Sequence, residues 1–288
     1  MRCIVQKGKL IYDEMSKVLR RRKGNSSPEA SPGRLKIEPL YKILDIEPTV
    51  PINDEPCFPK GCAKFLMVAP STGGKTTVIV NIIKNAWLKY DKLWLWSKTL
   101  DDADYQALIK GFQKPDIGST VITFDPENPD AVVDAQVVVS NVLSTFPDYA
   151  IFKESLPDNG VHLVVLDDFG PDKFFNSAEF SQFVDVSRHA NIQIIVVQHS
   201  FANTMSKTRS KFNQFCLFNG SLNGKAAIDH AYEYLGTCLS KKCFTRLYNL
   251  ASNEQYGFMY VDLKEPDYTK RYRKGFDGFF DKDMFDLC

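Results

Sequence analysis

The sequence predicts an α/β fold with a mainly parallel central sheet flanked by helices. Apolar, strand-like runs alternate with stretches of helical periodicity from Cys62 onward, as is typical of parallel sheets built from strand–helix–strand units. Several runs are continuously apolar, which is expected of strands covered on both faces. One run, 65–68, leads into a loop of small residues and then into another apolar stretch, so a strand, a tight loop and a helix follow one another directly.

Strands are predicted where short runs rich in β-branched and aromatic residues end at turn-forming residues. They cover 65–68, 92–97, 120–124, 161–166, 193–197, 214–218 and 256–263. Helices are predicted where apolar residues recur every three to four positions. They cover 76–88, 101–112, 129–143, 177–189 and 224–235.

Composition and charge limit the class of protein. The chain has 288 residues, of which 44% are hydrophobic and 25% charged, and its net charge of +1 excludes a uniformly basic nucleic-acid coat. No apolar run approaches the ~20 residues that span a membrane, and the N-terminus lacks the apolar core of a signal peptide. The seven cysteines are scattered and form no Cys-x-x-Cys pair, so we expect reduced thiols in an intracellular protein that is not secreted.

Four segments are predicted along the chain. Residues 1–36 carry ten Lys and Arg against three Asp and Glu and form a basic, disordered tail, which contacts DNA phosphates, acts as a nuclear localisation signal or is simply solvated. Residues 37–60 contain five prolines and form an extended lead-in. Residues 61–265 form the main domain, and 266–288 form an aromatic and basic C-terminal segment.

The loop after the first strand resembles a phosphate-binding P-loop. Its backbone N–H groups and the following helix N-terminus would cradle phosphates, Lys75 would reach the β- and γ-phosphates, and the Thr76 hydroxyl would hold Mg²⁺. The pattern G-x-x-x-x-G-K-[ST] has Ala69 in place of its first glycine; alanine is the smallest substitute, so we expect the turn to survive. The alternative is an ordinary strand–turn–helix. The predicted nucleotide-binding residues are Ala69, Pro70, Ser71, Thr72, Gly73, Gly74, Lys75, Thr76 and Thr77.

A second motif follows the apolar run 161–166, which ends in Asp167-Asp168. An apolar buried strand would aim Asp167 at the edge of the sheet where the P-loop lies, so Asp167 is the candidate Mg²⁺ residue, acting through water or through Thr76. Asp168 is the candidate general base for the attacking water. The alternative is that Asp168 is only a turn residue or a helix cap.

The order of the motifs predicts how the sheet is arranged. Two predicted strands, 92–97 and 120–124, lie between Lys75 and Asp167, and one of them is expected to insert between the P-loop strand and the Asp167 strand. This additional-strand, catalytic-acid arrangement is that of P-loop ATPases and not of nucleotide kinases. The strand after Asp168 ends at Gln198, which is expected to sense the γ-phosphate or to orient the water, or else to cap backbone groups in a loop.

Together these residues resemble a known family. Gly-Gly-Lys-Thr, Val-Val-Leu-Asp-Asp, Arg188-His189-Ala190-Asn191-Ile192 and the strand that ends at Gln198 are similar to the genome-packaging ATPases of large DNA viruses, virophages and Polinton-type elements, in the FtsK–HerA group of P-loop NTPases. The resemblance covers about residues 60–220. The Arg-His-x-Asn-Ile entry into the last of these strands is its more specific part.

The resemblance implies a DNA-translocating ATPase with ATP and Mg²⁺ as cofactors. It implies a homo-oligomeric ring, pentamer or hexamer, that moves double-stranded DNA of any sequence into a capsid, contacts capsid proteins and has no membrane partner. It places the protein in the infected cell, in a virus factory or the nucleus, or in the virion. Arg209 would act in trans as an arginine finger, with Lys207 and Lys211 as alternatives, unless this cluster is a solvated basic face. The alternatives are a replication or helicase-type ATPase and a nucleotide-dependent scaffold with little turnover.

Two further basic segments are candidates for contacts to DNA phosphates, which carry no sequence information. They are Lys241-Lys242 and the segment 268–276. For the second segment the alternative is docking on the core, with Phe276, Phe279 and Phe280 buried.

Overall fold

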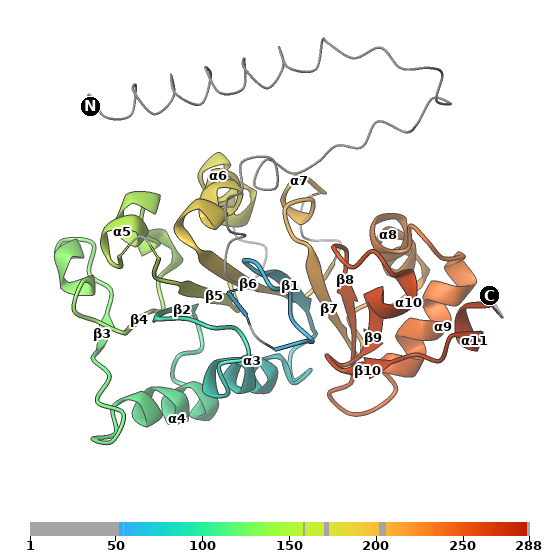
Figure 1. The fold of residues 1–288 in the computed structure, drawn as a ribbon, viewed down its shortest axis with the longest axis horizontal. Coiled ribbons are helices and arrows are strands. Elements are labelled where there is room, and N and C mark those ends of the chain that lie inside the picture. Colours follow the sequence, from blue (N-terminus) through green and yellow to red (C-terminus); the bar gives the residue numbers. More distant parts are fainter. Residues whose placement is uncertain (1–51, 54, 158, 170–172, 202–205, 287–288) are drawn as a thin grey trace, which may run out of the picture. The chain divides into compact units, whose positions relative to one another are not determined.

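The computed structural model describes residues 52–53, 55–157, 159–169, 173–201 and 206–286. These residues belong to one compact unit, 50–288, built around a ten-stranded sheet (Figure 1). The predicted basic tail 1–36 and most of the predicted lead-in 37–60 lie outside the described residues. In the part of the chain that is described, no helix is both long enough and apolar enough to cross a membrane.

The sheet is mainly parallel, as predicted. Its strands are β1 (Lys64–Val68), β2 (Lys92–Ser97), β3 (Val121–Thr123), β4 (Val137–Ser140), β5 (His162–Asp167), β6 (Ile192–Gln198), β7 (Gln214–Phe218), β8 (Phe258–Asp262), β9 (Tyr272–Lys274) and β10 (Gly278–Phe279). Their order is β10-β9-β8-β7-β1-β6-β5-β2-β4-β3. The strands from β7 to β3 pair in parallel, and β8, β9 and β10 extend the β7 side with antiparallel pairs.

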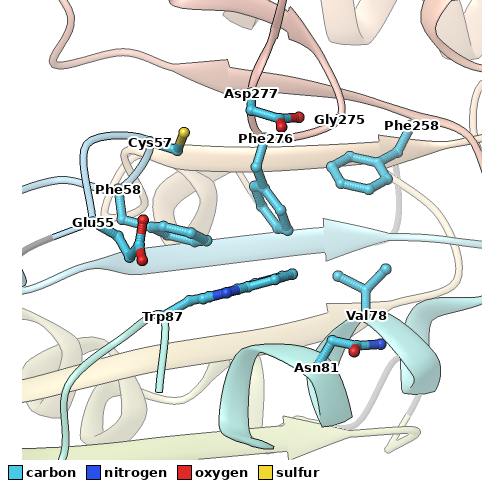
Figure 2. A pocket seen from close by; sticks show the side chains of 10 residues that line it. All are labelled: Glu55, Cys57, Phe58, Val78, Asn81, Trp87, Phe258, Gly275, Phe276 and Asp277. Carbon is cyan, nitrogen blue, oxygen red and sulfur yellow. The ribbon is translucent and has the colours of Figure 1, made fainter. Parts of the chain in front are cut away.

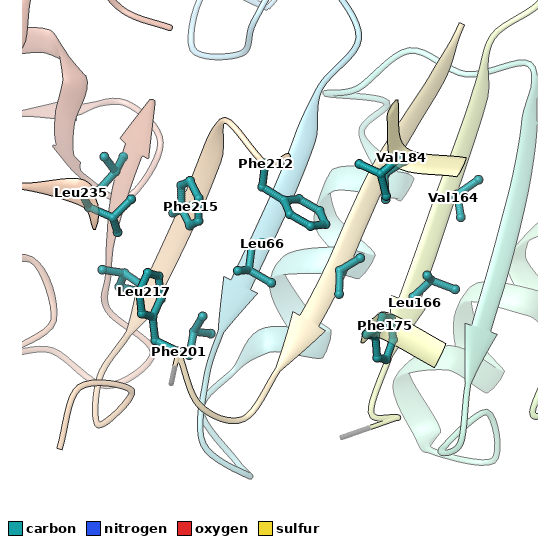
Figure 3. Packing of buried hydrophobic residues seen from close by; sticks show 14 of the residues in the cluster. Leu66, Val164, Leu166, Phe175, Val184, Phe201, Phe212, Phe215, Leu217 and Leu235 are labelled. Atoms are coloured by element: carbon teal, nitrogen blue, oxygen red, sulfur yellow. The ribbon is translucent and has the colours of Figure 1, made fainter. Parts of the chain in front are cut away.

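Helices cover both faces of the sheet because each central strand is apolar on both sides. In β1, Phe65 and Met67 pack with α3 (Lys75–Lys84) and α4 (Ala103–Phe112) on one face. Leu66 and Val68 pack on the other face, together with side chains of the helices there. Figure 3 shows part of this second layer, where strand side chains meet side chains from the helices and connecting loops. The helices of this face are α5 (Tyr149–Glu154), α6 (Ala178–Val186), α8 (Lys225–Leu235) and α9 (Lys241–Ala251).

The remaining helical segments among the described residues are single turns. They are η1 (Pro129–Val132), η2 (Leu143–Thr145), η3 (Lys173–Asn176), η4 (Ser187–Ala190), α7 (Ser206–Arg209), α10 (Tyr268–Arg271) and α11 (Asp283–Asp286). The helix predicted over 129–143 is therefore wrong, because this segment holds η1, β4 and the start of η2. The valines of β4 are buried, and the strand pairs with both β2 and β3. A run of β-branched residues favours a strand at such a position inside the sheet.

The segment that forms the strand between β1 and β5 is not the one expected. Neither 92–97 nor 120–124 inserts there, because β2 pairs with the far side of β5 and β3 lies at the edge. The inserted strand is β6, which comes after the Asp167 strand in the chain. The additional-strand arrangement itself is confirmed. It brings the ends of β1, β6 and β5 to one edge of the sheet, with Val68 opposite Gln198.

The C-terminal segment is part of the sheet. β9 pairs with β8, and the buried guanidinium of Arg273 donates to the carbonyls of Cys57 and Phe276, so Arg273 is a structural residue and not a DNA contact. Phe276 is half-buried among aromatic rings and Phe280 is also partly buried, as the docking alternative expected. The expected burial of Phe279 is wrong, because this side chain is 55% exposed.

Candidate nucleotide-binding site

The loop after β1 is folded tightly enough to expose its backbone to a ligand. Ala69 is fully buried and its N–H donates to the carbonyl of Gln198 at 3.0 Å, which continues the β1–β6 ladder. Gly73 N–H donates to the Pro70 carbonyl at 3.1 Å. A Cβ at position 73 would lie 3.0 Å from that carbonyl and 3.2 Å from the Cβ of Ala69, so the loop accommodates alanine at 69 and requires glycine at 73.

The helix α3 begins directly after a glycine in the left-handed conformation. Gly74 has φ 85°, and a Cβ there would meet the ring of Tyr256 at 2.6 Å. Tyr256 lies in the loop between α9 and β8, has φ 65° and is 54% exposed. A tyrosine ring from a distant part of the chain therefore lies on the backbone of the loop at the start of α3, where phosphate-binding N–H groups are expected.

Three ionisable side chains meet beside this loop. The amine of Lys75, at the first position of α3, lies 3.7 Å from Oδ1 of Asp168. The same carboxylate oxygen lies 2.6 Å from Nε2 of His199. Asp168 has φ 61°, so the backbone turns sharply at the end of β5 and presents this carboxylate between the loop and the end of β6.

Asp167 is the buried carboxylate of the site. It is fully buried, and its Oδ2 accepts a hydrogen bond of 2.7 Å from the hydroxyl of Tyr105 on α4. Burial raises the pKa of Asp167, while the Tyr105 hydrogen bond and the charge of Lys75 oppose that rise. Its Oδ1 has no hydrogen-bond partner among the described residues. A buried anionic oxygen without a partner is the kind of ligand that a hard divalent cation or its bound water satisfies.

The donors present fit Mg²⁺ in the manner of P-loop sites. One hydroxyl, Thr76, and one carboxylate, Asp167, would leave most of the coordination shell to water and phosphate oxygens, which Mg²⁺ prefers over an all-protein cage. Within the described ranges, no group of three or more His, Cys, Asp or Glu that could hold a metal occurs. Thr76 is half-buried at the second position of α3.

Gln198 and Arg209 have different positions relative to the site. Gln198 ends β6 and is 3% exposed, and its carbonyl joins the strand to Ala69. The guanidinium of Arg209 lies 4.7 Å from the ring centre of Phe201 and donates to the Phe201 carbonyl at 2.9 Å. Arg209 is thus held by contacts within its own chain, and burial lowers its pKa. Lys211 forms an ion pair with Asp185. The side chain of Lys207 lies outside the described residues.

The P-loop borders an open cleft of about 390 Å³. Its lining residues are Ser71, Thr72, Gly73, Gly74, Lys75, Thr76, Thr77, Thr99, Asp102, Asp104, Asp168 and Tyr256. The structure therefore places nearly the whole predicted loop and Asp168 around one cleft.

Three residues of the site, Tyr105, His199 and Tyr256, were not predicted from the sequence. His199 follows Gln198 at a strand end and could have been found, whereas no local pattern marks the two tyrosines.

Comparison with known proteins supports a specific family. Residues 60–255 match the model of the Poxvirus A32 protein family. The fold is similar to that of the genome-packaging NTPase B204 of Sulfolobus turreted icosahedral virus 2 in complex with sulfate, with a TM-score of 0.50, 12% identity, and coverage of 70% of this chain and 92% of that one. For B204, the DNA-packaging ATPase of Sulfolobus turreted icosahedral virus, the TM-score is 0.49, with 14% identity and coverage of 70% and 92%. The chain has no significant match among curated protein sequences.

The family match extends over more than half of the chain and includes the P-loop, Asp167, Asp168 and Gln198. The P-loop cleft and the presence of an added strand between β1 and β5 also agree with the additional-strand arrangement that the motifs predict. The chain therefore belongs to the Poxvirus A32 protein family, and with it to the viral genome-packaging ATPases of the FtsK–HerA type.

Proposed function

We propose that this packaging ATPase binds ATP with Mg²⁺ at the loop Ala69–Thr77 and uses the hydrolysis of ATP to move double-stranded DNA into a capsid. The observation that carries the proposal is the convergence of Lys75, Asp167 and Asp168 at one edge of the sheet. Lys75 and Asp168 are 3.7 Å apart, and Asp167 offers a buried oxygen without a protein partner.

Each residue has a role that follows from its chemistry. The ammonium of Lys75 would leave Asp168 to neutralise the β- and γ-phosphates, while the loop N–H groups hold their oxygens. Thr76 and Asp167 would hold Mg²⁺, which, when bound, offsets the charge of the phosphates. Freed from Lys75, Asp168 would accept a proton from the attacking water.

Two polar residues at the end of β6 would support this chemistry. His199, 2.6 Å from Asp168, fixes the orientation of the carboxylate. Gln198 ends the strand beside the loop, where its amide would orient the water or contact the γ-phosphate. Arg209 would serve as a finger to a neighbouring subunit only after leaving the Phe201 carbonyl, so this assignment requires a local rearrangement.

A basic helix face is the proposed DNA contact. On α9, Lys242, Arg246 and Asn249 are exposed and share one face, because they are spaced by four and three residues. The opposite face is buried through Phe244 and Leu247, which fixes the orientation of the helix. Contacts from such a face would go to phosphates and would be independent of base sequence.

The assembly and its location are inferred from the family resemblance. We infer a homo-oligomeric ring, pentamer or hexamer, in which neighbouring subunits share ATP sites, and which acts on a capsid in the virus factory or nucleus of the infected cell. Residues 61–265 would be the ATPase domain, with 1–36 as a basic tail. The strands β9 and β10 attach the described part of the C-terminal segment to the same sheet.

The test is an ATPase assay at low salt with and without long duplex DNA of two unrelated sequences. Both sequences should stimulate hydrolysis equally. Lys75→Ala should abolish ATP binding, and Asp168→Asn should keep binding but lower kcat on the order of 100-fold, as expected for loss of a general base. Hydrolysis that is indifferent to DNA would contradict the motor, and an active Asp168→Asn protein would make Asp168 a turn residue.

A further inference from the structure

A second cavity, lined by aromatic side chains, lies next to the P-loop cleft. It borders α3 at Val78 and Asn81, which follow the α3 residues that line the cleft. Its volume is about 340 Å³, which is within the range of small-molecule sites of about 300–1,000 Å³. The lining residues are Glu55, Cys57, Phe58, Val78, Asn81, Trp87, Phe258, Gly275, Phe276 and Asp277. Figure 2 shows the rings of Phe58, Trp87, Phe258 and Phe276 gathered around it, with Val78 and Asn81 of α3 at its lower side. We call this cavity the aromatic pocket.

The aromatic pocket is built around the ring of Phe276. The ring centre of Phe276 lies 4.8 Å from that of Phe58, 5.0 Å from that of Phe258 and 6.0 Å from that of Trp87. These rings come from the lead-in, the loop after α3, β8 and the β9–β10 turn, so the fold gathers them from distant parts of the chain. Phe276 and Trp87 remain partly exposed, and exposed aromatic surface in a hollow is typical of a ligand site.

The aromatic pocket and the phosphate cleft are adjacent along two elements. On α3, Thr77 lines the phosphate cleft and its neighbour Val78 lines the aromatic pocket. Before and within β8, Tyr256 lines the cleft and Phe258 lines the pocket. Asn81 joins the two sites, since its Nδ2 donates to the Thr77 carbonyl at 2.8 Å. A nucleotide whose phosphates follow the loop toward Thr77 therefore meets the aromatic pocket next.

We propose that the aromatic pocket binds the purine base of the nucleotide whose phosphates occupy the P-loop. This inference rests on the proposed nucleotide site and adds to it the place of the base. A flat base offers two π faces, and stacking on aromatic side chains is its common mode of recognition. The Asn81 amide oxygen and the Asp277 carboxylate are acceptors at the pocket, and they match the exocyclic amino group of adenine.

The arrangement explains why four aromatic rings and few charges surround this pocket. A phosphate would find no lysine or arginine among its lining residues, whereas Lys75 lines the neighbouring cleft. The phosphates of the nucleotide would therefore lie in the cleft at the N-terminus of α3, and its base would lie in the aromatic pocket one helical turn further along. Trp87 is also placed to report on occupancy, because the other two tryptophans, Trp94 and Trp96, are fully buried.

The test separates the base from the phosphates by comparing Mg·ATP with Mg·tripolyphosphate, which has no base. In the wild-type chain, ATP should change the emission of Trp87 and tripolyphosphate should not. In Phe276→Ala, calorimetry should show an ATP affinity lowered about tenfold, as for the loss of one stacking ring. The affinity for tripolyphosphate should be unchanged.

Two further variants keep the result decisive. Phe279→Ala is the matched control, because Phe279 is on the same hairpin, is 55% exposed and lies outside the pocket lining. Val78→Phe fills the pocket without removing a ring and should also weaken ATP but not tripolyphosphate, even if Phe276→Ala fails to fold. The proposal is overturned if Val78→Phe leaves ATP affinity at the wild-type value, or lowers both affinities equally.

The outcomes distinguish this proposal from that of the DNA motor. Wild-type protein that binds ATP through the pocket but shows no stimulation by DNA would contradict the motor and leave the base site standing. Strong DNA-stimulated hydrolysis with pocket variants of unchanged ATP affinity would contradict only the base site.

Discussion

At the scale of single residues, Asp167 and Tyr105 form a buried pair that no sequence motif connects. The tyrosine hydroxyl occupies one carboxylate oxygen at 2.7 Å and leaves the other without a described partner. The carboxylate is therefore held in one orientation, with Oδ1 as the oxygen it can offer to a metal or its water. Partners of this kind around a metal ligand commonly change metal affinity when they are removed.

The first prediction concerns this hydrogen bond. Tyr105→Phe should raise the Mg²⁺ concentration for half-maximal ATPase activity about 10- to 100-fold, because Asp167 loses the group that orients it. The measurement is a Mg²⁺ titration at saturating ATP. Tyr90→Phe is the control, since the Tyr90 hydroxyl donates to the Ile83 carbonyl and not to the site. Identical Mg²⁺ curves for the two variants would refute the role of Tyr105.

The second prediction concerns His162 at the start of β5. Burial and the nearby charge of Lys92 lower the pKa of His162 from 6.5 to about 4, and its Nδ1 accepts from the Trp94 indole at 3.0 Å. The unfolded chain therefore takes up a proton near pH 6.5 while the folded chain does not. Stability that is present above pH 6.5 should be lost as the pH falls toward 4, by on the order of 3 kcal/mol in free energy of unfolding.

Urea unfolding at a series of pH values measures this effect. His162→Gln keeps a polar side chain but has no titration in this range, so its stability should fall less steeply between pH 6.5 and 4. Parallel pH profiles for the wild type and His162→Gln would show that His162 does not contribute to the acid sensitivity.

At the scale of elements, the junction between the P-loop and α3 depends on a contact from outside. Gly74 is left-handed and has the Tyr256 ring against it, so neither the backbone conformation nor the space suits a side chain. The loop 252–257 that carries Tyr256 connects α9 to β8. The segment that follows the proposed DNA-contact helix α9 therefore contacts the phosphate loop directly through Tyr256.

The third prediction concerns this junction. Gly74→Ala should lower ATP affinity by more than tenfold, because a left-handed alanine costs about 1–2 kcal/mol and its Cβ also meets Tyr256 at 2.6 Å. Gly111→Ala in α4 is the control, since nothing lies within 4 Å of a Cβ there. It should raise stability by about 0.5–1 kcal/mol and leave ATP affinity unchanged. Calorimetry measures the ATP affinity of both variants, and thermal unfolding measures their stability. Equal ATP affinities would show that the left-handed glycine at position 74 is not required for ATP binding.

At the scale of the whole molecule, two different parts of the sheet are suited to different tasks. The strands β1, β6 and β5 bring the proposed nucleotide-binding and catalytic residues to one edge, and the antiparallel strands β8 and β9 carry α9 on one face of the sheet. Near-neutral net charge means that DNA affinity must come from local basic surfaces and not from the molecule as a whole. The exposed face of α9 is such a surface.

The fourth prediction concerns DNA binding by this face. The double variant Lys242→Ala, Arg246→Ala should weaken binding to duplexes of any sequence and reduce the slope of log affinity against log salt by about two. Lys110→Ala, Lys114→Ala is the matched control, because these lysines are exposed on and just after α4, on the other face of the sheet. Equal salt slopes for the two variants would remove α9 from the DNA interface.

The sequence by itself determined the parts of this protein that depend on local chemistry. A small-residue loop that ends in Gly-Lys-Thr between a strand and a helix specifies a phosphate site through its own backbone, and an apolar run that ends in two carboxylates specifies a buried strand with an acidic end. The strands β2 and β7 were predicted at their observed bounds, because apolar runs flanked by polar residues have few alternatives.

Tertiary structure alone decided which distant segments meet. The insertion of β6 between β1 and β5, the choice of a strand for Val137–Ser140, and the contacts Tyr105–Asp167 and Tyr256–Gly74 depend on packing across the whole sheet. The same packing holds Arg209 against Phe201, although the family resemblance implied an arginine finger that acts in trans. Local patterns record which backbone conformation a segment prefers, but the pairing of segments is set by the burial that the complete fold achieves, and no short stretch of sequence contains that information.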